Sequence, residues 1–420
     1  MTFRGYDGVC QDNHITRKVE MHYSTLSEAV AQDCDGVVFD VDSLYSRLLK
    51  VADHRARRGV RYELALLLLM VVLAKLAGQD KPEGIAEWVT LRAAFFGEAF
   101  QLKRPLTPHA MTYRRVLANR ALAVALDTLM REYLLSWPQA GQSVQIALDG
   151  KTLRGTVATE SNRGLHLLAA YLPEEGVVLM QAEVAGHTNE IPVAPQVLKV
   201  LDLQGKIVTG DALLAQRALS QVIVEAGGDY LWTVKDNQPQ LRHDIEQLFQ
   251  VEICLPGTSP VITEVRTAQT VEKSHGRLTT RRLTACSLLR DSSDWPYLQQ
   301  VFKIERWSVC LRTGAMQTET AYGVTSLTAR QASPARLLQL NRGHWGIENG
   351  LHYRRDVTLQ EDAGRTTATA FGHTMAALNN LVIGLTIGRG WRNLAKARRY
   401  FDAHPDHALR LVLARPTTTL

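Results

Sequence analysis

The spacing of hydrophobic residues in the first third of the chain is typical of helices. The most apolar run, Leu64 to Ala74, lies between Glu63 and Lys75; it is too short to cross a bilayer and predicts a buried helix. Strand-like alternation is scarce in this region, so we expect a helical domain at residues 41–138 after a polar N-terminal arm at 1–40. The predicted helices are Leu44 to Val51, Tyr62 to Ala77, Gly84 to Phe96 and Pro108 to Glu132.

After Pro138 the pattern changes to the alternation expected of strands. Residues 144–150 read VQIALDG, in which the large apolar residues Val144, Ile146 and Leu148 alternate with Gln145 and Ala147. A helix is predicted at 213–226, where two glycines end it. The resulting order of strands and helices predicts a mixed sheet with helical cover, the first part of a core at 139–260. The other predicted strands are 165–172, 176–184, 205–212 and 229–235.

A second stretch of alternation without a helical period predicts a β-strand insertion at 261–325. Helices resume after Ser333-Pro334 and give the second part of the core at 326–400, followed by a C-terminal tail at 401–420. The predicted fold class is therefore α/β, with an N-terminal helical domain and C-terminal helices. The four predicted strands of the insertion are 263–273, 277–289, 299–309 and 316–327.

Composition and charge narrow the picture only slightly. The chain has 420 residues and a formal net charge of +6, which permits a nucleic-acid partner without requiring one. Basic clusters such as the one containing Arg57 and Arg58 either bind DNA or are solvated surface. The five cysteines are widely spaced and the first residues lack an apolar signal core, so we expect a protein of the cytoplasm, with no membrane partner.

Two aspartates stand where predicted strands end. Asp149 lies at the end of the first strand of the core, at 144–150, and Asp211 lies at the end of the strand at 205–212. Each aspartate could simply cap a turn or helix. If the two strands are neighbours, however, both carboxylates converge on one point, and such a pair is costly unless a divalent cation neutralises it. Carboxylate oxygens suit Mg²⁺ or Mn²⁺.

A third carboxylate, Glu348, lies on the helix after the insertion. At α-helical spacing, His344, His352 and Arg355 share its face. This arrangement is typical of a metal ligand beside groups that clamp phosphates. A competing interpretation is a zinc site made by His344, Glu348 and His352, which would leave the two aspartates without a purpose.

Several residues could either contact DNA or have only a local structural role. Lys151 and Arg154 could approach a phosphate or form a basic turn, and Lys235 and Asn237 could contact a DNA backbone or begin a helix. His275 and Arg277 flank Gly276 at a hairpin tip that could enter a DNA groove or be only a tight turn.

Four further residues are expected to have structural roles or remain open. Glu190 could brace the acidic site, although an Asx-type turn explains its surroundings nearly as well. Trp345 is expected in the core. Glu361 and Asp362 could assist the site, but pairing with Arg365 is the favoured expectation.

The chain resembles the DDE transposases of bacterial insertion sequences, of the ISAs type that includes the H-repeat-associated proteins. The resemblance covers roughly residues 40 to 400. Six blocks carry it in order: the segment from DHRARRG to GIAEW, then ALDGKTLRGT, HTNEIP, VTGDALLAQR with GGDYLWTVKDNQPQL, SHGRLTTRRL, and RGHWGIENGLHYRRDVTLQED.

The resemblance implies an RNase H-like catalytic core in which Asp149, Asp211 and Glu348 hold two Mg²⁺ ions per active site, with Mn²⁺ as a substitute. It implies cleavage of DNA at element ends and strand transfer into target DNA. The expected partners are double-stranded DNA with terminal inverted repeats, target DNA, and a second copy of the chain as a homodimer on DNA. The expected location is the bacterial cytoplasm, on the nucleoid when bound. A transposase-derived DNA-binding protein without catalysis is the alternative.

Overall fold

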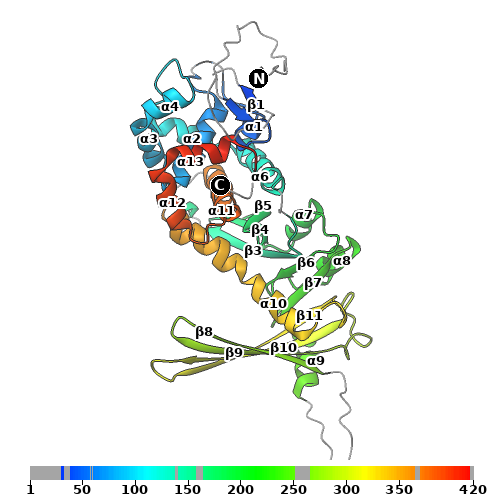
Figure 1. The fold of residues 1–420 in the computed structure, drawn as a ribbon. Coiled ribbons are helices and arrows are strands. Elements are labelled where there is room, and N and C mark those ends of the chain that lie inside the picture. The colour runs from blue at the N-terminus through cyan, green and yellow to red at the C-terminus, as the bar shows by residue number, and fades with distance from the viewer. Residues whose placement is uncertain are drawn as a thin grey trace, which may run out of the picture.

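A computed structural model describes residues 30–32, 38–56, 58, 60–137, 141–157, 164–250, 265–364 and 369–416. A nine-stranded mixed sheet crosses this described part of the protein, with a helical body at one end and a β-rich arm at the other (Figure 1). A separate pair of short strands, β1 (Val30–Gln32) and β2 (Val38–Asp40), lies at the N-terminal side of the body.

Five strands form the half of the sheet nearest the helical body. Their order is β5-β4-β3-β6-β7, with β3, β6 and β7 parallel to one another and β4 antiparallel to its neighbours. Strands β4 and β5 agree with the strands predicted at 165–172 and 176–184, and they pair as a hairpin. The bounds are β3 Gln145–Leu153, β4 Leu165–Leu172, β5 Val177–Val184, β6 Ile207–Gly210 and β7 Asp229–Val234.

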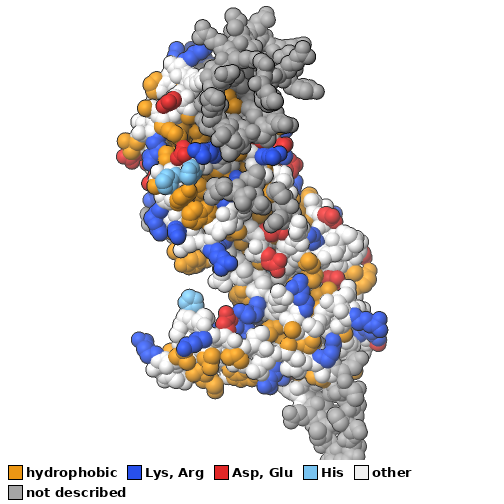
Figure 2. Space-filling view, viewed as in Figure 1, with side chains coloured by type: hydrophobic (Ala, Val, Ile, Leu, Met, Phe, Trp, Pro, Cys, Tyr) orange, Lys and Arg blue, Asp and Glu red, His pale blue; other side chains and the backbone are white. Residues whose placement is uncertain are grey.

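The predicted β insertion extends this same sheet. Its last strand, β11 (Met316–Thr325), pairs antiparallel with β7 and continues the sheet through β10 (Gln300–Cys310), β9 (Arg277–Cys286) and β8 (Arg266–Ser274). The β8–β9 hairpin projects as an arm, and Figure 2 shows a hollow between this arm and the helical body.

Helices cover the sheet at the core. Helix α10 (Pro334–His344) crosses from β8 and β9 to β6 and β3. The others are α7 (Ala194–Lys199) beside β4 and β5, α8 (Arg217–Glu225) beside β7, and α9 (Pro239–Gln250) beside β10 and β11. Two π-helical turns, Glu348–His352 and Arg354–Thr358, follow α10 and are succeeded by a 3₁₀ turn at Glu361–Ala363.

The helical body combines helices from the N-terminal third of the chain with the last described helices (Figure 1). The C-terminal helices α12 and α13 pack on α2, and α13 also packs on α1. Helix α2 is the predicted apolar helix, and all of its residues are buried. The helices of the helical body are α1 Leu44–Leu48, α2 Leu64–Leu76, α3 Pro82–Leu91, α4 Ala93–Ala99, α5 Ala110–Leu117, α6 Arg120–Leu135, α11 Thr369–Gly388, α12 Leu394–Ala403 and α13 Pro405–Leu413.

One feature of the helical body differs from the expectations. The predicted tail at 401–420 contains helix α13, nine residues long, whose apolar residues, including Leu409 and Val412, complete the packing around α1 and α2. Helix α11 is long and apolar enough to cross a membrane, but 83% of its most apolar window is buried by the rest of the protein. It packs on α6 and β5 and is therefore a core helix.

A buried ionic network joins α12 to α2 and to the loop that follows α2. The ammonium of Lys75 lies 3.2 Å from Asp80, and the guanidinium of Arg398 in α12 lies 2.6 Å from the other oxygen of the same carboxylate. Arg398 also donates to the carbonyls of Lys75 and Thr358. Burial lowers the pKa of Lys75, so the nearby carboxylate is needed to keep this group charged.

We predict that Asp80→Ala lowers the free energy of unfolding by about 3–5 kcal/mol, because it leaves two buried cations unpaired. Asp53→Ala is the control, since it breaks the exposed Asp53–Arg55 pair and should cost less than about 1 kcal/mol. Thermal and urea unfolding of the full chain measure both variants. Equal losses in the two variants would contradict the structural role of the network.

Candidate active site

Asp149 and Asp211 lie at the same end of a parallel strand pair. The pairing of β3 with β6 ends at Leu148 and Gly210, and each aspartate is the next residue. Strand β3 does not end at Asp149 as expected, because its antiparallel pairing with β4 continues to Leu153. The strands are nevertheless neighbours, as the convergence argument required. The Asp211 carboxylate also accepts hydrogen bonds from the backbone of Leu213 and Leu214, so the capping role holds too.

Glu348 reaches this place from the first π-helical turn after α10. A π-helix has about 4.4 residues per turn and is frequent at functional sites. Its wider turn keeps His352 beside Glu348 but changes where later residues point. Seven residues beyond Glu348, an α-helix would complete about two turns, whereas π-helical turns complete about 1.6. Arg355 therefore points away from Glu348, into the protein.

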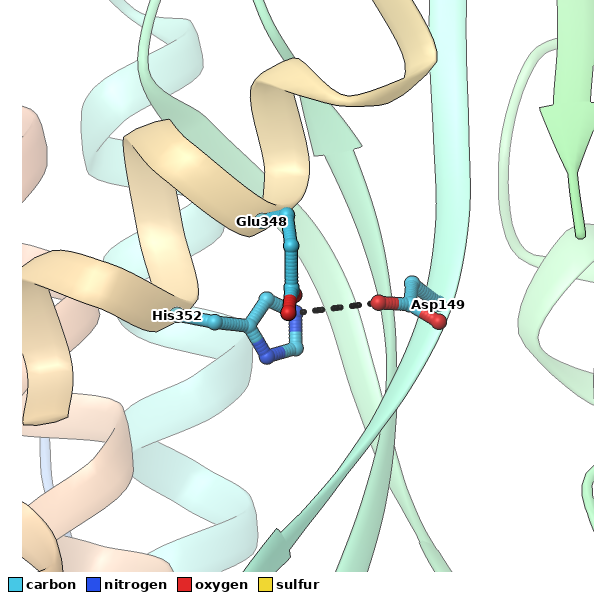
Figure 3. Close-up of side chains that lie close together, drawn as sticks. All are labelled: Asp149, Glu348 and His352. Carbon is cyan, nitrogen blue, oxygen red and sulfur yellow. Dashed lines mark ion pairs between the residues drawn. The ribbon is translucent and has the colours of Figure 1, made fainter. Parts of the chain in front are cut away.

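Asp149, Glu348 and His352 form one cluster (Figure 3). Ligand atoms of the three side chains lie within 4.8 Å of one another. The Nε2 atom of His352 lies 3.7 Å from the Asp149 carboxylate, which is too long for a hydrogen bond. This buried nitrogen has no hydrogen-bond partner among the described residues.

A fourth carboxylate, Glu190, lies against the backbone beside Asp149. Its Oε1 atom is 2.9 Å from His166 Nε2, and a Cβ added at Gly150 would lie 1.8 Å from Glu190 Oε1. A side chain at position 150 would therefore displace the Glu190 carboxylate and the His166 ring. The Asn189 side chain accepts from the Ile191 backbone as an Asx turn, so the turn and the bracing position of Glu190 occur together.

These neighbours change the acidity of Asp149. Burial, followed by the charges of Glu190, Glu348 and Asp211, raises the pKa of the Asp149 carboxyl to about 7. Near neutral pH the group is therefore only partly ionised unless a cation offsets the surrounding charge. A divalent cation does this for clustered carboxylates.

The two histidines of the site are neutral. Burial lowers the pKa of His352 to about 3 and the pKa of His344 to about 4. The approach of His352 to Asp149, drawn as a dashed line in Figure 3, is therefore not an ion pair at neutral pH. A neutral imidazole with a free ring nitrogen is a metal donor.

The residues present therefore fit a divalent cation, because they combine carboxylate oxygens, a pKa raised by like charge and an unpartnered imidazole nitrogen. The zinc alternative fares less well: His344 is not part of the described three-residue cluster and instead lies 3.4 Å from the Thr209 hydroxyl. The histidine that joins Glu348 is His352, and Asp149 takes the remaining place.

Two residues expected to clamp phosphates are occupied elsewhere. Lys151 is buried and binds Asp356 at 2.6 Å. Arg355 is fully buried and binds Glu361 at 2.8 Å, so Glu361 pairs with Arg355 in the core, while the expected partner Arg365 lies outside the described residues. These geometries correct the expected surface roles of Lys151 and Arg355.

The remaining expected DNA contacts are more exposed. The side chain of Asn237 donates to the carbonyl of Ala212 and so holds the turn that carries Asp211, while Lys235 beside it is exposed. Arg154 is exposed on the turn after β3. Arg58 is also exposed, and Arg57 lies outside the described residues.

His275 and Arg277 are exposed at the end of the β8–β9 arm. His275 and Gly276 both have positive φ, at 47° and 71°, and form the tight two-residue turn of a hairpin. The turn interpretation is confirmed. The contact of this turn with a DNA groove remains a prediction.

The sequence alone left the role of Glu190 open and wrongly predicted that Trp345 lies in the core. Glu190 lies in a loop far from the strand ends in sequence, and only its place in the HTNEIP block pointed to it. Trp345 follows the last residue of α10 and is 59% exposed, so it is not a core residue.

Comparison with known proteins identifies the class. The family described as "Transposase DDE domain" matches residues 140–383, and the family described as "DDE_Tnp_1-associated" matches residues 45–133. The first match covers more than half of the chain, so the chain belongs to the DDE transposase family.

Within that family, the relatives include H-repeat-associated proteins. "Putative transposase YncI" of Escherichia coli O157:H7 is 26% identical over 82% of this chain and 87% of its own length. "H repeat-associated putative transposase YhhI" of Escherichia coli K12 is 26% identical over 77% and 84%. A solved piggyBac transposase synaptic complex with hairpin DNA aligns at 12% identity over 89% of this chain and 76% of that chain, with a TM-score of 0.41.

The carboxylate cluster predicts an unusual effect of Asp149→Asn on stability. Because the pKa in the folded state is about 7, the folded protein loses stability as pH rises from the usual value of an aspartate to about 7, by roughly 4 kcal/mol in total. In EDTA at pH 8, Asp149→Asn should therefore raise the unfolding temperature, by about 5 °C.

Measurement at two pH values and with metal tests this cause. At pH 5 the gain from Asp149→Asn should fall by half or more, because the wild-type carboxyl is then mostly protonated. Adding Mg²⁺ at pH 8 should stabilise the wild type more than the variant. A variant that is less stable than the wild type in EDTA at pH 8 would contradict the account of the cluster.

Proposed function

We propose that this chain is a DNA transposase that cuts DNA at the ends of an insertion sequence and joins those ends to target DNA, using divalent metal ions. The observation that carries the proposal is the meeting of Asp149, Glu348 and His352 within 4.8 Å, at the strand end that Asp211 shares. These residues come from three separate segments, as expected of a built site rather than of chance surface acidity.

Asp149, Asp211 and Glu348 would hold two Mg²⁺ ions, or Mn²⁺. Bound ions would activate water and the terminal hydroxyl and would stabilise charge on the scissile phosphate. Around them, Glu190 adds negative charge and the neutral His352 offers its free ring nitrogen to the same space. Asn237 holds the turn that carries Asp211 in place.

The proposed core is RNase H-like. The order β5-β4-β3-β6-β7, with three parallel strands and β4 antiparallel, supports this assignment. In the proposed division, 41–138 binds the element ends, 139–260 and 326–400 form the catalytic core, and 261–325 is an insertion that extends the core sheet as an arm.

The proposed partners are double-stranded DNA with terminal inverted repeats and the target DNA, bound by a homodimer in the bacterial cytoplasm. The exposed residues Arg58, Arg154, Lys235, His275 and Arg277 are the candidates for contact with the DNA backbone. Binding of this kind weakens steeply with salt, because each contact releases condensed counterions.

A transposase-derived DNA-binding protein without catalysis is the second candidate. It requires no acidic cluster, whereas here a buried aspartate is kept at a raised pKa beside three other carboxylates. Such an arrangement costs stability and is typical of functional sites. A strand-transfer assay separates the two candidates.

We predict that Asp149→Asn lowers cleavage of DNA carrying the element ends by about 1,000-fold or more in Mg²⁺, with little change in DNA affinity. The substrate is taken from the inverted repeats that flank the coding region. Glu225→Gln, an exposed carboxylate on α8, is the matched control and should cleave normally. Cleavage retained by Asp149→Asn would refute the assignment.

A further inference from the structure

A groove of about 590 Å³ follows the outer side of the helix that carries Glu348. It lies between this helix and the beginning of α12. Asn349, the residue directly after Glu348, lines the groove, so the groove lies along the same helix as this carboxylate. The other lining residues used below are Tyr353, Arg354, Val357, Arg392 and Arg399.

The groove carries unbalanced positive charge. In the described part of the chain, no carboxylate pairs with Arg354, Arg392 or Arg399. The acidic residue that also lines the groove, Asp402, is already bound by Trp88 and Arg92 at 2.9 Å each. Arg354 donates to the carbonyl of Gly350, but none of the three guanidinium groups is neutralised by a carboxylate among the described residues, and guanidinium groups match the charge and geometry of phosphates.

The same groove exposes apolar surface. Tyr353 is 56% exposed and Val357 is 55% exposed, although both lie on a helix whose inner side is tightly packed. A duplex backbone offers phosphates and sugars but leaves its bases stacked inside. An exposed aromatic ring beside arginines is the combination that binds unpaired bases together with their phosphates.

We propose that this groove binds an unpaired stretch of DNA strand next to the acidic site, with phosphates on Arg392 and Arg399 and a base stacked on Tyr353. The volume is that of a site for one or two nucleotides, not for a duplex. The inference deepens the proposed function and rests on it for its meaning, because the bound strand would continue into the acidic site.

Binding of a labelled oligothymidylate of about 12 nucleotides, measured by fluorescence anisotropy in EDTA, tests the proposal without needing cleavage or a known repeat sequence. Arg392→Ala/Arg399→Ala should weaken binding by about tenfold or more and reduce the salt slope by about 1.4. Lys50→Ala/Arg330→Ala removes two exposed charges elsewhere and is the matched control, expected to bind like the wild type.

The aromatic ring is tested separately. Tyr353→Ala should weaken binding of the oligothymidylate by about 5- to 100-fold, whereas Tyr353→Phe, which keeps the ring, should bind like the wild type. Because Tyr353 is exposed, neither change should disturb folding, and circular dichroism and unfolding temperature verify this.

A blunt duplex of the same length decides between unpaired and paired DNA. Loss of duplex binding equal to the loss of single-strand binding in Arg392→Ala/Arg399→Ala would overturn the proposal, as would unchanged binding of both. Cleavage by Asp149→Asn would refute the proposed function and leave the groove untouched, so the two failures are distinguishable.

Discussion

The burial of Asp149 among other carboxylates is the constraint on which the site depends. Its desolvation and the charges of Glu190, Glu348 and Asp211 all oppose its ionisation. The cations nearest in sequence do not relieve this, because Lys151 binds Asp356 and Arg355 binds Glu361. The protein's own positive charge is thus directed to a second set of carboxylates. The negative charge of the first set, which surrounds Asp149, is therefore left to be offset by a bound metal ion.

That second set of carboxylates fixes the helix that carries Glu348. Lys151 ties the helix to β3 through Asp356, and Arg355 ties it to the following turn through Glu361, which also accepts from Asn379 in α11. The ion pairs face inward, where low polarity makes them sensitive to geometry. Glu348 is therefore positioned by contacts made further along its own helix, and Tyr353 and Val357 on the outer side of that helix remain exposed.

Part of this arrangement could be predicted from the sequence. Alternation predicted the strands of the core and the insertion, and the positions of Asp149 and Asp211 after β-type runs indicated their convergence. The π-helical turns could not be predicted, because no local residue pattern distinguishes them from α-helix. Expectations that relied on α-helical spacing therefore failed for Arg355, while His352, only four residues from Glu348, stayed close in both geometries. Glu190 depended on long-range packing that no local pattern encodes.

The division of the chain into domains also changes in three dimensions. The sequence separates an N-terminal helical domain from C-terminal helices, but Arg398 in α12 contacts the carbonyl of Lys75, the carboxylate of Asp80 and the carbonyl of Thr358 at once. These three partners belong to α2, to the loop after it and to the end of the Glu348 helix. The helical body cannot rotate against the acidic site without breaking buried charged hydrogen bonds, each of which is costly to leave unpaired. The helical body and the helix that carries Glu348 are therefore held together by these contacts.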